Sequence, residues 1–255
     1  MATSGSYLRD WSAAWLALRQ WCRGALAALS RVIHRPPKHP FDRMHRVDTD
    51  GLIYADALST GHEHDRHSAG YYATAPSLFH GAIALWRETL PATARTLSGY
   101  TLVDIGCGKG RVVMLASEHE FREVVGIELN PRLAAVARKN LRKWMIRTRA
   151  CTRVRIIEGD ALSTPLPDGP VVLFFFNSFE REMVEMWLAQ LAQTAASRTH
   201  PIDLIYLHPE FDELVRQVPG IQAMADVQIP FSAEDAAADA FDVAVDRCAM
   251  YRMQQ

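Results

Sequence analysis

The stretch that decides the fold reads Val103-Asp104-Ile105-Gly106-Cys107-Gly108-Lys109-Gly110-Arg111, and Val124-Val125-Gly126-Ile127-Glu128 follows it. Residues 101–105 are apolar and β-branched, which predicts a central parallel strand. The glycines after it can adopt positive φ and let a ligand approach bare backbone. Residues 112–118 predict a helix with free N–H groups at its start. Residues 124–127 predict a second strand, with Glu128 at its tip, where a carboxylate can accept both hydroxyls of a ribose.

The spacing of the glycines separates two classes of nucleotide ligand. Dinucleotides favour G-x-G-x-x-G, but Arg111 stands at the position of the third glycine. Asp104 precedes the turn, where a carboxylate repels a pyrophosphate and suits a ligand with an ammonium group. The D-x-G-x-G-x-G pattern resembles the first motif of class I S-adenosylmethionine (SAM)-dependent methyltransferases, and Glu128 resembles the ribose-binding acid of the second. The resemblance implies an enzyme with SAM as its cofactor, which carries an amino-acid tail and no phosphate.

The rest of the chain predicts the remaining elements of such a fold. We expect further strands at 154–157, 171–176, 202–207, 223–229 and 242–251, and helices at 78–89, 131–144, 181–193 and 211–217. Only the short stretch 232–240 separates the last two strands, and a parallel crossover needs roughly a dozen residues. The last strand should therefore be antiparallel. The expected fold is α/β, a doubly wound, Rossmann-like, seven-stranded sheet with an N-terminal helical extension.

Two upstream segments and the strand tips extend the resemblance to residues 41–252. Residues 41–51 look like the entry segment of a group of bacterial methyltransferases of undefined substrate. Residues 71–77 resemble the segment before the first motif in bacterial and non-SET, lysine-directed enzymes, where a Tyr and a Thr touch the methionine end of SAM. Asp160 resembles the acid that binds the adenine amino group. The resemblance assigns cofactor binding to Tyr71, Thr74, Asp104, Gly106, Cys107, Gly108, Gly110, Glu128, Leu129, Asp160, Ala161 and Asn177.

Asn177-Ser178-Phe179 follows the apolar strand at 171–176 and bears on the methyl acceptor. It resembles the tip motif of methyltransferases that act on nitrogen, so Asn177 and Phe179 should orient an amine, such as a protein lysine. Asn177 could instead cap the helix that begins near Glu180. His208 is a candidate base, or else a helix-entry residue before Pro209. Alternatives are oxygen or carbon methylation of a small molecule, methylation of RNA, and a regulatory subunit that binds SAM without turnover.

The segment from Gly61 to His67 is dense in potential metal ligands. His62, His64 and His67 could share a metal or serve as bases in the acceptor pocket. No well-spaced fourth ligand is evident, so we expect a polar loop and no stable metal.

Composition points to a cytoplasmic protein. The four cysteines are scattered without C-x-x-C spacing, which suits a reducing compartment. No basic segment leads into an uninterrupted apolar core with a cleavage site, so secretion is not expected. The net charge of −1 argues against broad nucleic-acid binding.

Residues 1–46 are predicted to form a basic amphipathic helix and linker, ahead of a catalytic domain at 47–255. Eight Lys or Arg against two Asp give this segment +6, which leaves −7 for the remainder. Residues 7–34 carry an apolar heptad pattern that Pro36 ends. The helix should pack on the catalytic domain or on a second copy of the chain. Alternatives are peripheral contact with a membrane surface and guidance of an acidic or nucleic-acid substrate.

Overall fold

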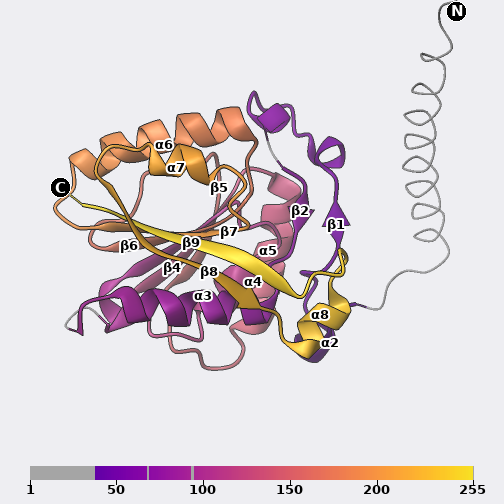
Figure 1. The fold of residues 1–255 in the computed structure, drawn as a ribbon. Helices are drawn as coiled ribbons and strands as arrows, with labels where there is room; N and C mark the ends of the chain where they lie inside the picture. The colour runs from indigo at the N-terminus through magenta and orange to yellow at the C-terminus, as the bar shows by residue number, and fades with distance from the viewer. Residues whose placement is uncertain (1–37, 68, 93–94, 255) are drawn as a thin grey trace, which may run out of the picture. The chain divides into compact units, whose positions relative to one another are not determined.

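The centre of the structure, a computed structural model that describes residues 38–67, 69–92 and 95–254, is one sheet. Its strands are β3 (Thr101–Ile105), β4 (Glu123–Glu128), β5 (Val154–Glu158), β6 (Val171–Phe176), β7 (Ile202–Leu207), β8 (Ile221–Pro230) and β9 (Val245–Met253). Their order is β5-β4-β3-β6-β7-β9-β8 (Figure 1). β3 to β7 are parallel, whereas β9 is antiparallel to both neighbours. The predicted fold class, with its antiparallel last strand, is confirmed.

Strand boundaries agree best with the prediction where the strand is almost fully buried. β3, β6 and β7 have the predicted bounds, and nearly every residue in them is buried. β9 begins at Val245, later than the predicted residue 242. Asp242 has a φ of 57°, and this left-handed conformation is incompatible with a strand.

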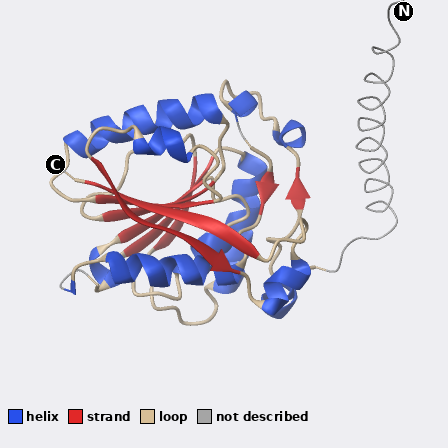
Figure 2. Cartoon of the chain, viewed as in Figure 1, coloured by secondary structure: helices blue, strands red, loops and turns tan. Residues whose placement is uncertain are grey.

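Helices cover both faces of the sheet (Figure 2). They are α3 (Pro76–Thr89), α4 (Arg111–Ala116) and α5 (Pro131–Trp144) on one face, and α6 (Arg181–Ala196) and α7 (Asp212–Arg216) on the other. Side chains alternate along each strand. Leu102 therefore packs in the apolar cluster that includes residues of α3 and α4, and Val103 packs in the cluster that includes residues of α6. α4 is shorter than predicted because the Ser117 hydroxyl donates to the carbonyl of Met114 and competes with the helical pattern.

The compact unit that contains the sheet begins at His39. The short helix α2 (Pro40–His45) buries Phe41, whose ring centroid lies 5.5 Å from that of Trp144. The unit therefore starts earlier than the predicted boundary at residue 47, because Phe41 packs in the core. The helix predicted for residues 7–34 lies outside the described residues. In the described part of the chain, no helix is long and apolar enough to cross a membrane.

A segment between α2 and α3 crosses the carboxyl ends of the parallel strands (Figure 1). It holds a two-stranded antiparallel sheet of β1 (Leu52–Ile53) and β2 (Tyr71–Tyr72). Between these strands lie two 3₁₀ turns, η1 (Ala55–Leu58) and η2 (Asp65–His67). The segment covers the edge where open α/β sheets bind ligands.

Candidate functional site

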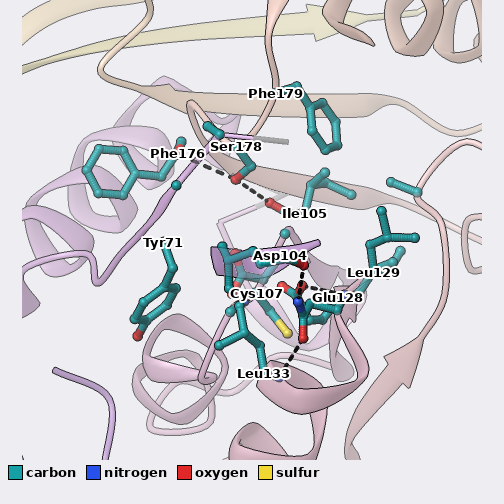
Figure 3. Close-up of a pocket in the computed structure, with 18 of the residues that line it drawn as sticks. Tyr71, Asp104, Ile105, Cys107, Glu128, Leu129, Leu133, Phe176, Ser178 and Phe179 are labelled. Carbon is teal, nitrogen blue, oxygen red and sulfur yellow. Dashed lines mark hydrogen bonds between the residues drawn. The ribbon is translucent and has the colours of Figure 1, made fainter. Parts of the chain in front are cut away.

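A pocket lies at the carboxyl ends of β3, β4, β5 and β6, and residues of η1, η2 and β2 also line it. Figure 3 shows residues of its wall, among them Tyr71, Asp104 and Glu128. The predicted site residues that line it are Tyr71, Thr74, Asp104, Gly106, Cys107, Gly108, Glu128, Leu129, Asp160, Ala161 and Phe179. Gly110, Asn177 and His208 are not among its lining residues. Four successive strand tips thus meet at one cavity, as a parallel sheet requires.

The glycine turn needs its glycines for close approach as well as for backbone conformation. Gly106 and Gly108 have φ of 73° and 53°. A Cβ atom on Gly106 would lie 2.7 Å from the Cβ of Ser178, and one on Gly108 would collide with the ring of Tyr71. The turn is therefore closely covered by the tip of β6 on one side and by β2 on the other. Gly110 has a different role, as the residue that caps the start of α4.

Glu128 organises the glycine turn and faces the pocket. Its Oε2 accepts the N–H of Gly108 at 2.7 Å, and its Oε1 accepts the N–H of Asn130 at 2.8 Å. Burial raises the pKa of this carboxyl group, although the two backbone hydrogen bonds oppose the shift. Each oxygen retains a lone pair, so the carboxylate can accept two ribose hydroxyls without breaking these bonds.

Asp104 is the second buried acid of the pocket, with 5% of its surface exposed. Burial and then the negative charge of Glu128 raise its pKa well above the usual range. Within the described ranges, no hydrogen bond to its carboxylate is found, in contrast to Glu128. An unpaired acid in this position favours a cationic ligand group, such as an ammonium, and disfavours a phosphate.

Cys107 lies in the glycine turn and also lines the pocket. Burial, followed by the charges of Asp104 and Glu128, raises the pKa of its thiol well above the usual range. Only a thiolate is an effective nucleophile, and the raised pKa disfavours that form. Cys107 is therefore part of the pocket wall and not a nucleophile.

Tyr71 and Thr74 enter the pocket from β2 and the residues after it. The Tyr71 hydroxyl donates to the carbonyl of Thr49, and burial raises the pKa of this phenol. The Tyr71 ring is thereby fixed against Gly108.

Arg111 has a structural role that the sequence did not reveal. In the sequence it is notable only because it occupies the position of the third glycine of the dinucleotide pattern. It is 3% exposed and lines the pocket from the start of α4. Its Nε donates to the Thr49 hydroxyl at 2.7 Å, and one terminal nitrogen lies 3.5 Å from Asp42. Asp42 in turn accepts the backbone N–H groups of Thr49 and Asp50. The available signal was an arginine in the first turn of an otherwise apolar, buried helix.

The predicted acceptor residues are divided between the pocket and a polar group beside it. Phe179 lines the pocket, with Ser178 next to it. Asn177 has a φ of 40°; its Nδ2 donates to Glu210 at 2.7 Å, and its Oδ1 accepts from the Tyr206 hydroxyl at 3.1 Å. The alternative that Asn177 caps α6 is wrong, because Glu180 occupies the N-cap position.

His208 lies at the tip of β7 with a φ of 49° and an exposed ring. Its Nδ1 lies 3.1 Å from Asp246, and this hydrogen bond raises the pKa of the imidazole against the opposing effect of desolvation. A raised pKa keeps more of the ring protonated at neutral pH, which lowers the fraction of His208 that is available as a free base.

The predicted histidine loop contacts the pocket wall. His64 Nδ1 lies 3.0 Å from Asp160 Oδ2, whereas the other oxygen of Asp160 accepts the N–H of Leu162. His67 is buried, 3.5 Å from Glu182. Across the described residues, no group of three or more His, Cys, Asp or Glu is arranged to hold a metal ion.

The chain is similar to known proteins over part of its sequence and in its fold. Residues 102–201 match a family model described as a methyltransferase domain. The methyltransferase domain of bacterial CtHen1 has a TM-score of 0.50 and 10% identity, over 71% of this chain and 98% of that chain. An RNA methyltransferase from Salinibacter ruber, solved with S-adenosyl-L-homocysteine, has a TM-score of 0.46 and 18% identity, over 72% and 94%. Precorrin-6y C5,15-methyltransferase from Geobacter metallireducens has a TM-score of 0.48 and 17% identity, over 82% and 100%. No curated protein sequence matches the chain.

Proposed function

We propose that the chain is a SAM-dependent methyltransferase with the class I fold, and that its methyl acceptor is a nitrogen atom of an amine, such as a lysine side chain. The observation that carries the proposal is the polar group at the tips of β6 and β7. In this group, Asn177 is held between Tyr206 and Glu210. The next two residues of the β6 tip, Ser178 and Phe179, line the cofactor pocket. The polar group therefore borders the end of the pocket at which an acceptor would bind.

The groups present suit an amine. When bound, SAM supplies the electrophilic methyl group. The Oδ1 of Asn177 accepts one hydrogen bond from Tyr206 and retains a lone pair for an N–H of the acceptor. Glu210 is exposed, and one of its oxygens binds Asn177. Its other oxygen is suited to attract a protonated amine and to take the proton that must leave before nitrogen attacks. The remaining barrier is lowered mainly by alignment of the reacting atoms.

The acceptor class is tested by incubating the protein with methyl-labelled SAM and a cell lysate separated into protein, RNA and small molecules. Label in protein that survives alkali and elutes as methyl-lysine after acid hydrolysis supports the proposal. Label confined to RNA, or methanol released from esters by alkali, contradicts it and supports one of the alternatives. SAM binding with no transfer to any fraction indicates a regulatory subunit.

The role of the polar group is tested by Asn177→Ala and Glu210→Gln. We expect transfer to fall by about 100-fold in Asn177→Ala, because the acceptor loses its orientation. SAM affinity should stay unchanged, since Asn177 does not line the cofactor pocket. Glu213→Gln is the matched control: this carboxylate is also exposed near α7, but it pairs with Arg181. Equal losses in the Glu210 and Glu213 variants would contradict a specific role for Glu210.

A further inference from the structure

The loop before η2 is a compact turn built around one carboxylate. Asp65 Oδ2 accepts the backbone N–H groups of Thr60, Gly61 and His62 at 2.6, 2.6 and 3.1 Å. Its Oδ1 accepts the Thr60 hydroxyl at 2.8 Å. A carboxylate that gathers several donors within a few residues holds the backbone of a turn. The residue before Asp65 is therefore presented in a defined position.

That residue is His64, and its ring binds the acid at the tip of β5. His64 Nδ1 lies 3.0 Å from Asp160 Oδ2, and the two side chains are 18% and 10% exposed. A carboxylate can only accept hydrogen bonds, so Nδ1 carries the hydrogen. With Leu162 N–H on Oδ1 at 2.9 Å, both oxygens of Asp160 are held. Each oxygen retains one lone pair, and the plane of the carboxylate is fixed.

The loop is attached to the body of the protein independently of His64. The Leu58 carbonyl accepts from Asn130 Nδ2 at 2.6 Å, on the β4 side of the pocket. On the β6 side, the His67 carbonyl accepts the N–H of Glu180 at 2.8 Å. The segment thus spans the pocket with backbone anchors at both ends. Loss of the His64 ring would remove its contact with Asp160 without releasing the segment.

We propose that His64 is a positioning residue that sets the base specificity of the cofactor site through Asp160. The inference rests on the assignment of Asp160 to the adenine amino group, and it is independent of the methyl acceptor. An exocyclic amine donates to the fixed lone pair of Asp160. A hypoxanthine ring carries a carbonyl oxygen at this position, which repels the carboxylate. A site whose acceptor is held in place rejects such an analogue more strongly than one whose acceptor can rotate away.

The test compares the affinities of S-adenosylhomocysteine and S-inosylhomocysteine by calorimetry with the full chain. His64→Phe keeps a ring and removes the donor, whereas His64→Asn keeps a donor near the position of Nδ1 and removes the ring. We expect the preference for adenine to fall by about ten-fold in His64→Phe, the value of one hydrogen bond to a charged group, and to recover in His64→Asn. Glu63→Gln is the matched control, because Glu63 belongs to the same turn and is exposed.

Asp160→Asn separates a failure of this inference from a failure of its premise. If Asp160→Asn keeps the full preference for adenine, Asp160 does not contact the base, and both assignments fall. If Asp160→Asn removes the preference while His64→Phe retains it, only the role of His64 is overturned. Equal loss of affinity for both nucleosides in His64→Phe would also overturn it, since the ring would then serve only to cover the pocket.

Discussion

Replacement of Asp104 by Asn should change the stability of the protein and its affinity for SAM in opposite directions. Asp104 is 5% exposed, and burial and the charge of Glu128 raise its pKa. Between the unfolded and the folded pKa, the native state binds more protons than the unfolded state. The free energy of unfolding therefore falls as pH rises through that window, from about pH 4 upward. Asn cannot ionise, so the variant should avoid this loss.

The size of the effect follows from the cost of an unsatisfied buried group. We expect Asp104→Asn to stabilise the ligand-free protein by about 1–2 kcal/mol at about pH 8, or roughly 2–8 °C in Tm. The gain should vanish toward about pH 4, where the acid is already protonated. SAM affinity should fall by about 10- to 100-fold, because the cationic ligand loses its charged partner. Differential scanning calorimetry across pH measures the first effect, and titration calorimetry the second.

Asp203→Asn is the control at a buried carboxylate that has partners. Asp203 on β7 accepts from Trp86 Nε1 at 2.9 Å and from Arg252 Nε at 2.7 Å. Its removal should destabilise the protein by about 3 kcal/mol and leave SAM affinity unchanged. The reasoning is refuted if Asp104→Asn destabilises the protein at every pH as Asp203→Asn does, or if it binds SAM with wild-type affinity.

Two further substitutions test how the glycine turn is covered and anchored. Gly108→Ala should abolish measurable SAM binding, because residue 108 has a φ of 53° and the new Cβ would collide with the Tyr71 ring. Combination with Tyr71→Ala should restore part of the binding, and no recovery would contradict the steric cause. Arg111→Met should lower the free energy of unfolding, measured by urea titration, by about 3 kcal/mol, because Asp42 is left buried without its cationic neighbour. A loss below about 1 kcal/mol would contradict the structural role of the Arg111–Asp42 pair.

The cofactor side of the site was largely predictable because its information is local. A strand tip, a glycine turn and an acid are each encoded within a few residues. The parallel topology then brings successive strand tips to one edge of the sheet. Asp104, Glu128 and Asp160 line the same pocket for this reason. Asn130 could also have been found, since an Asn before Pro131 at a strand tip is typical of a helix cap.

The residues proposed for the acceptor side, and the contact between His64 and Asp160, depend on residues that are far apart in the sequence. Asn177 is oriented by Glu210 and Tyr206, 33 and 29 residues away in sequence. His64 contacts Asp160 across 96 residues. No periodicity or spacing in the sequence encodes such contacts, because they depend on how the fold brings the segment between α2 and α3 and the strand tips together.

The two sides of the site also use the same backbone conformation in different ways. Gly106 and Gly108 adopt positive φ so that a ligand can approach bare backbone. Asn177 and His208, at the tips of neighbouring strands, adopt φ of 40° and 49° although they carry side chains. Such strain costs about 1–3 kcal/mol per residue and persists only where surrounding contacts over-determine it. Here the Asn177 side chain is held from both ends, and His208 is held by Asp246 through its ring and by the Arg247 carbonyl through its backbone N–H. Glycine at either position would relieve the strain, but it would also remove the polar side chain and its contacts.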